Sequence, residues 1–169
     1  MPLVTAGLIE APQHRIMGRY RELPSGELRV RMAEDVQFGG ARETPAQAMG
    51  RRYENKVGRH LASRTASLSW ELWDHQWLEY ESEHGFELAQ PDFVLIRPDN
   101  SAIVVECKLT FTDCWPQIHF YNELLKGLGL DPVGVLVCKN LTAAATSSAY
   151  PRVRKLEDIT TTSYWQLRL

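Results

Sequence analysis

The chain has 169 residues, of which 44% are hydrophobic and 24% charged, the composition of an ordinary globular domain that can bury a core. No apolar run approaches the roughly 20 residues that span a bilayer, and three scattered cysteines are too few for a disulfide framework, so we expect a cytoplasmic protein without membrane contact. The net charge of −2 argues against a generally basic nucleic-acid coat.

The charge is nevertheless distributed unevenly along the chain. Residues 14–64 hold 11 Lys and Arg against 6 Asp and Glu, whereas residues 65–110 hold 2 against 9. This asymmetry suits a protein that grips a polyanion with one part and holds cations with another, although two solvated faces are the simpler explanation.

The first predicted element is a basic β-hairpin over Met17–Met32, turning at Pro24-Ser25-Gly26. Four arginines share one face of this ribbon: Arg19, Arg21, Arg29 and Arg31. Like charges opposite one another destabilise a ribbon unless an anion covers them. We therefore expect this face either to bind phosphate or to be solvated.

The next predicted element is a helix that is capped by Thr44, has Pro45 at its first position and runs to Ser63. Its buried stripe consists of residues at helical spacing: Met49, Tyr53, Val57 and Leu61.

Glu54 lies next to this stripe, in line with Gly50 and Gly58, and we expect the two glycines to leave room around its carboxylate. Arg51 and Arg59 lie off the stripe, where they either reach a backbone phosphate or are solvated.

The rest of the chain predicts an α/β fold with a central mixed sheet flanked by helices. Residues 65–75 are ambiguous between helix and strand, and residues 163–169 are a candidate edge strand. Between them we expect three consecutive antiparallel strands, over Gln76–Glu81, Phe86–Arg97 (broken at Pro91) and Ala102–Leu109 (central in the sheet). A helix over Trp115–Lys126 and a fourth strand over Pro132–Cys138 follow. We treat the chain as one domain, with a core over 44–140 between extensions over 1–43 and 141–169.

Three charged residues stand against the most hydrophobic strands: Asp92, Glu106 and Lys108. Glu106 and Lys108 point to one face of their strand because side chains alternate. A three-residue loop over 98–100 places Asp92 opposite Glu106, whereas a two-residue loop sends it to the face of Cys107. Neighbouring carboxylates repel one another unless a divalent cation lies between them, and oxygen ligands select Mg²⁺, with Mn²⁺ as a substitute. Lys108 would then hold a water aimed at phosphorus.

Pro91-Asp92, followed after thirteen residues by Glu106-Cys107-Lys108, resembles the PD-(D/E)XK nuclease superfamily. Glu54 in GRRYE matches that family's helical acid, and Gln117 and Tyr121 in QIHFY match the Gln-x-x-x-Tyr motif of its RecB-like and lambda-exonuclease-like branch. The likeness covers about residues 45–140, and the region resembles short phage-encoded nucleases more than large multidomain members of the superfamily. It implies a restriction-endonuclease-like core and a metal-dependent deoxyribonuclease.

The resemblance also implies roles for these residues. Asp92 and Glu106 would coordinate Mg²⁺, with the Cys107 carbonyl as a third ligand, and Glu54 would complete or orient the metal shell. Lys108 would position the attacking water.

Gln117 would orient Lys108 or a ligand, or else simply form hydrogen bonds at the start of its helix. Tyr121 would touch phosphate, or else be an aromatic residue of the core.

Three scattered cysteines exclude the iron–sulfur cluster of some RecB-like members. The short chain predicts structure-directed or weakly specific cleavage of DNA, at single strands, ends or branches. Exo- or endonuclease action and homo-oligomer formation stay open, as do two alternatives to the enzyme: an inactive DNA-binding module of the same fold, and a structural component whose acids bind metal for stability.

Overall fold

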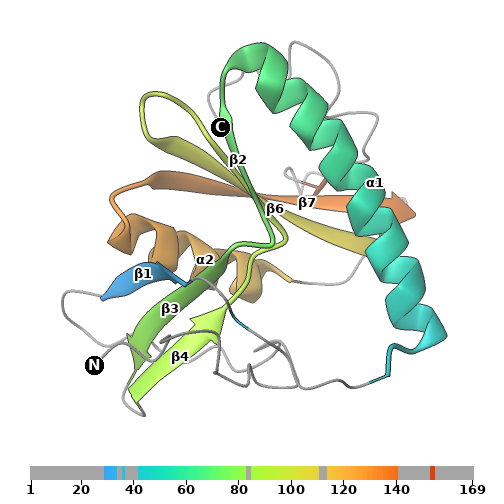
Figure 1. Cartoon of the computed structure of the whole chain (residues 1–169), viewed down its shortest axis with the longest axis horizontal. Coiled ribbons are helices and arrows are strands. Elements are labelled where there is room, and N and C mark those ends of the chain that lie inside the picture. The colour runs from blue at the N-terminus through green and yellow to red at the C-terminus, as the bar shows by residue number, and fades with distance from the viewer. Residues whose placement is uncertain are drawn as a thin grey trace.

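The computed structural model describes residues 29–33, 36, 42–82, 85–110, 114–140 and 153–154. This part forms an α/β arrangement of two helices and two sheets, with strand orders β1-β3-β4 and β2-β5-β6-β7-β8 (Figure 1). Among these residues, no helix combines the length and the apolar character that crossing a bilayer requires. The elements are β1 (Val30–Ala33), α1 (Pro45–Leu68), β2 (Glu71–Asp74), β3 (Trp77–Ser82), β4 (Gly85–Ala89), β5 (Phe93–Ile96), β6 (Ser101–Thr110), α2 (Trp115–Gly127), β7 (Asp131–Asn140) and β8 (Val153–Arg154).

Helix α1 begins where the sequence predicts. The Thr44 hydroxyl accepts a hydrogen bond from the Gln47 N–H, and the Gln47 side chain accepts one from the Thr44 N–H, which together form a capping box. The helix ends at Leu68, five residues later than expected, and Ser69 follows in the left-handed conformation with φ 56°.

The buried stripe of α1 is one turn displaced from the prediction. Tyr53, Val57 and Leu61 are buried as expected, and Thr65 continues the stripe toward the C-terminal end. Met49 is 56% exposed, so its assignment to the stripe was wrong. The apolar cluster under α1 includes Tyr53 but no earlier helix residue among those described, which leaves the first turns of α1 without a buried face.

The larger sheet lies between the two helices (Figure 1). Strand β6 is central, as predicted, because it pairs antiparallel with β5 and parallel with β7. Odd-numbered residues such as Val105 and Cys107 pack with α1, whereas even-numbered ones such as Val94 and Val104 pack with α2. A strand covered on both faces explains the continuous apolar run of β6.

The segment predicted as one broken strand is two strands in different sheets. β4 pairs with β3 in the smaller sheet, whereas β5 pairs with β2 and β6 in the larger one. Pro91 lies between them and has no N–H to donate to a ladder, which favours a break there. Both expected antiparallel pairings are present, but they lie in different sheets, so the expectation of three consecutive strands in one sheet was wrong. The second neighbour of β5 is β2, formed by the stretch that sequence patterns left ambiguous.

The predicted N-terminal hairpin falls mostly outside the described residues, and so do Arg19, Arg21 and the candidate strand over 163–169. The last residues of the hairpin belong to β1, which pairs antiparallel with β3.

Candidate metal and catalytic site

The site begins with the register of three neighbouring strands. Asp74 of β2 lies opposite Phe93 of β5, and Phe93 lies opposite Val105 of β6. The next row along these strands holds His75, Asp92 and Glu106. The His75 N–H donates to the Asp92 carbonyl at 2.9 Å, so the pairing continues into this row.

The turn between β5 and β6 sets this row. The Arg97 N–H donates to the Ser101 carbonyl at 2.9 Å, which closes a three-residue loop over 98–100. The predicted register, with Asp92 opposite Glu106, is thereby confirmed. In a hairpin, residues directly opposite one another project to the same face.

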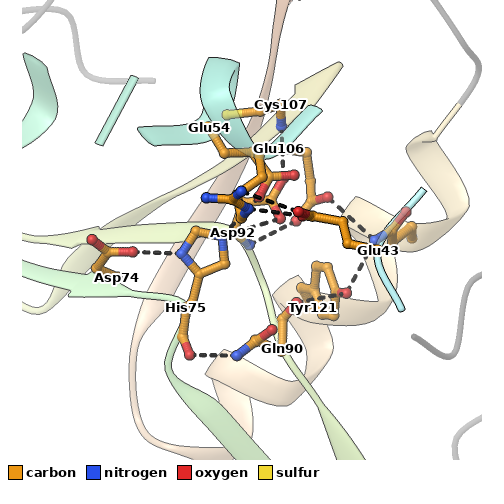
Figure 2. Close-up of polar contacts among 11 residues, drawn as sticks. Glu43, Glu54, Asp74, His75, Gln90, Asp92, Glu106, Cys107 and Tyr121 are labelled. Carbon is orange, nitrogen blue, oxygen red and sulfur yellow. Dashed lines mark hydrogen bonds and ion pairs between the residues drawn. The ribbon is translucent and has the colours of Figure 1, made fainter. Parts of the chain in front are cut away.

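Asp92 and Glu106 are both fully buried, at 0% exposure, and each carboxylate accepts hydrogen bonds from the chain (Figure 2). Asp92 Oδ2 accepts from the Cys107 N–H at 2.9 Å, and Glu106 Oε1 accepts from the Asp92 N–H at 3.1 Å. Hydrogen bonds to the ionised form offset part of the cost of burying a carboxylate. These hydrogen bonds therefore hold the two carboxylates next to each other in the interior.

Helix α2 holds the second oxygen of Glu106. The Gln117 amide donates to Glu106 Oε2 at 3.2 Å and to the Tyr121 hydroxyl at 3.0 Å. That hydroxyl in turn donates to the Gln90 carbonyl at 3.1 Å, and the Gln90 amide donates to the His75 carbonyl at 2.7 Å. These hydrogen bonds connect α2 to Glu106 on β6, to Gln90 shortly before Asp92, and through Gln90 to His75.

Gln117 and Tyr121 are both buried and form hydrogen bonds within the fold. Gln117 is 3% exposed and orients an acidic residue, Glu106. Tyr121 is 5% exposed and packs in the core under α2, which corresponds to the core-aromatic alternative. Its hydroxyl supports Gln117 from within the fold.

The imidazole of His75 lies among three acidic residues (Figure 2). Its Nε2 lies 3.1 Å from Glu54 Oε2 and 4.0 Å from Asp92 Oδ1, and its Nδ1 lies 2.5 Å from Asp74 Oδ1. One ligand atom each from Glu54, His75 and Asp92 can be chosen so that all three lie within 4.8 Å of one another. The described residues therefore contain a group of one nitrogen and two oxygen donors that is a candidate metal site.

The charge of His75 responds to these neighbours. Burial lowers the pKa of the imidazole, but hydrogen bonds to Glu54 and Asp74, and the negative charges of Asp92 and Glu54, outweigh burial and raise the pKa above its ordinary value. The acidic neighbours of His75 therefore favour the protonated form of the ring in the metal-free protein.

The structure also places the other residues of the Glu-x-Lys triplet. The Cys107 side chain lies on the opposite face of β6, in the core under α1. Burial first, and then the charges of Asp92 and Glu106, raise the pKa of this thiol well above its usual range, so it behaves as a small apolar side chain. Lys108 is half-buried, and strand alternation puts it on the face of Glu106.

The two glycines of α1 do not surround Glu54 as expected. A Cβ on Gly58 would lie 2.9 Å from Cε1 of Phe93, so this glycine makes room for the Phe93 ring. Nothing lies within 4 Å of a Cβ built on Gly50.

Four of the arginines predicted to contact phosphate belong to the described residues, and three of them form ion pairs with acidic side chains. Arg51 forms a two-point ion pair with Glu43 at 2.7 and 3.0 Å, and Arg59 is exposed. Arg31 forms an ion pair with the buried Glu79 at 2.7 Å.

Arg29 reaches Glu81 at 3.5 Å. Strand β3 therefore supplies the anions that face the described end of the predicted hairpin. A role of these arginines in phosphate binding stays a prediction.

His75 is the site residue that sequence reasoning missed. It follows a four-residue strand in the ambiguous stretch, and it has a left-handed backbone with φ 51° that no local pattern indicates. The one available signal was the pair Asp74-His75 at the end of an apolar stretch, seventeen residues before Asp92.

No protein-family model matches this chain, and no curated protein and no solved structure shows significant similarity to it.

Proposed function

We propose that this chain is a divalent-metal-dependent nuclease of the PD-(D/E)XK type, which hydrolyses DNA phosphodiester bonds with little sequence specificity. The observation that carries the proposal is the pair Asp92 and Glu106, opposite one another across β5 and β6, fully buried, with Glu54 close by. Two buried acids held this close are costly in a protein that makes no use of them.

The element order supports a restriction-endonuclease-like core. Helix α1, the antiparallel strands β2, β5 and β6, helix α2 and the parallel strand β7 follow one another around a single sheet. In this reading the β3–β4 hairpin is an insertion between the first two core strands.

Each residue then has a task in hydrolysis. Glu54 and Asp92 would hold the cation, and Glu106, fixed by Gln117, would share its charge or orient its water. A bound divalent cation makes the phosphate more electrophilic and a water more acidic. Lys108, on the face of Glu106, would hold the attacking water and stabilise charge on the phosphate.

The test is cleavage of plasmid and oligonucleotide DNA with Mg²⁺ or Mn²⁺, against EDTA. We expect Asp92→Asn and Lys108→Met to lower the rate at least about 100-fold, since the first removes a proposed metal ligand and the second removes the group proposed to hold the attacking water. Matched controls are Asp131→Asn and Lys139→Met, which change exposed residues of β7. Cleavage that survives both site substitutions overturns the assignment, and DNA binding without cleavage by the wild type indicates an inactive module.

Linear and circular single-stranded substrates separate the two modes of action. Equal rates on both exclude a strict exonuclease, because a circle offers no end.

A further inference from the structure

We propose that His75 is a ligand of the metal, held in place by Asp74, and that its nitrogen makes the site prefer Mn²⁺ to Mg²⁺. The inference rests on the proposed function for the use of the metal, but it concerns binding and can be tested without DNA. It revises the oxygen-only ligand set, and with it the expectation of Mg²⁺ as the first choice.

The distances between the donor atoms suit a shared ion. Ligand atoms about 2.1 Å from an ion lie about 3.0 Å apart at right angles and about 4.2 Å apart when opposite. His75 Nε2 lies 3.1 Å from Glu54 Oε2 and 4.0 Å from Asp92 Oδ1. Both separations fall in this range, and all three ligand atoms lie within 4.8 Å of one another, so small movements of these side chains would seat a cation.

Asp74 gives His75 the outer partner that a ligating histidine commonly has. Metal-bound imidazoles commonly donate their other N–H to a carboxylate, which fixes the tautomer and the ring orientation. Asp74 Oδ1 lies 2.5 Å from His75 Nδ1, on the side of the ring away from Glu54 (Figure 2). With the Nδ1 proton held there, Nε2 is the atom that faces Glu54 and Asp92.

The backbone independently holds His75 toward the pocket. Its N–H donates to the Asp92 carbonyl, and its carbonyl accepts from the Gln90 amide. Its ring meets the edge of Phe93 with centroids 5.1 Å apart. A non-glycine residue with φ 51° is held against a local cost of about 1–2 kcal/mol, and such strain concentrates at functional sites.

The donor type determines the expected selectivity. Mg²⁺ prefers oxygen ligands and retains much of its water, whereas Mn²⁺, which also favours oxygen, is the first member of the transition series whose affinities for nitrogen-containing sites rise toward Cu²⁺. An imidazole is therefore a better ligand for Mn²⁺ than for Mg²⁺. Loss of His75 should therefore weaken Mn²⁺ binding strongly and Mg²⁺ binding little.

The experiment is calorimetric titration of the EDTA-treated, desalted full chain with MnCl₂ or MgCl₂. We expect the wild type to bind Mn²⁺ at least tenfold more tightly than Mg²⁺. His75→Gln should weaken Mn²⁺ at least tenfold and Mg²⁺ less than threefold. Asp74→Asn should weaken Mn²⁺ about 10–100-fold, as the loss of an outer partner does. The matched control His119→Gln, at an exposed position of α2, should leave both affinities unchanged.

A second measurement needs no variant to fold. Pulsed electron paramagnetic resonance on the Mn²⁺-loaded wild type should show coupling to one imidazole nitrogen. Absence of that coupling, unchanged Mn²⁺ affinity in a folded His75→Gln protein, or failure of the wild type to bind Mn²⁺ would each overturn the inference.

The outcomes also separate this inference from the proposed function. His75-dependent Mn²⁺ binding without DNA cleavage overturns the nuclease and leaves the ligand assignment standing. DNA cleavage together with Mn²⁺ binding that does not depend on His75 supports the nuclease and overturns the ligand assignment.

Discussion

Substitution of the two glycines of α1 by alanine should have different effects on stability. Both lie inside one helix, where alanine is favoured over glycine by about 1 kcal/mol. At Gly50 a Cβ meets nothing within 4 Å, so we expect Gly50→Ala to stabilise the protein by about 0.5–1 kcal/mol.

At Gly58 the same methyl group meets the ring of Phe93. The Cβ would lie 2.9 Å from Cε1 and 3.0 Å from Cζ, well inside the roughly 3.5–4.0 Å of a comfortable carbon–carbon contact. Phe93 is 1% exposed and its ring also meets His75, so it has little freedom to retreat. Overpacking of this kind costs about 1–3 kcal/mol, which cancels or exceeds the helical gain. Gly58→Ala should therefore be about 1–3 kcal/mol less stable than Gly50→Ala.

Urea unfolding followed by circular dichroism in EDTA measures this difference directly, provided that both variants keep the wild-type m-value. A difference of this size corresponds to roughly 2–4 °C in melting temperature per kcal/mol for a chain of this length. Equal stabilisation by both substitutions would refute the reasoning, because it would mean that Phe93 does not pack against α1 at Gly58.

Three further predictions concern the polar groups Glu79, Glu106 and His75. Arg31→Ala should lower the free energy of unfolding by about 1–3 kcal/mol, because it leaves the buried carboxylate of Glu79 without this partner. Arg29→Ala removes an exposed ion pair and should change the free energy of unfolding by about 0.5 kcal/mol at most. Urea unfolding measures both effects. Gln117→Leu should cost about 1–3 kcal/mol in the same assay, since the acid on β6 loses a buried donor, and an unchanged midpoint would contradict the hydrogen bond. The pKa of His75 is raised in the folded, metal-free protein, so its stabilising contribution is complete below the ordinary pKa near 6.5 and is lost as the pH rises through the raised value. The stability difference between wild type and His75→Gln in EDTA should accordingly shrink from pH 5.5 to pH 8, and a constant difference would refute the pKa shift.

Local chemistry made several elements predictable. The helix start followed from Thr44 and Pro45, because a capping side chain and a proline without N–H both suit a first turn. The facing of Asp92 and Glu106 followed from the length of the loop over 98–100, because strand pairing has a period of two.

The failures came where tertiary context decided. Strand β2 has only four residues, two of them half-buried, which is too short for a periodic signal. Without β2, one of the two neighbours of β5 was missed, and His75, which directly follows β2, could not be brought next to Asp92. Met49 continued the helical spacing, but periodicity does not show where the sheet beneath a helix ends.

The turn at Pro98-Asp99-Asn100 has a consequence for how this chain can vary. Exposed loop tips ordinarily accept insertions and deletions at small cost. Here a single added or deleted residue that shifted the ladder by one position would carry the aspartate to the opposite side of the sheet and dismantle the pocket from a distance. Functional variants of this protein should therefore change this turn in its residues while conserving its length, or lengthen it by pairs.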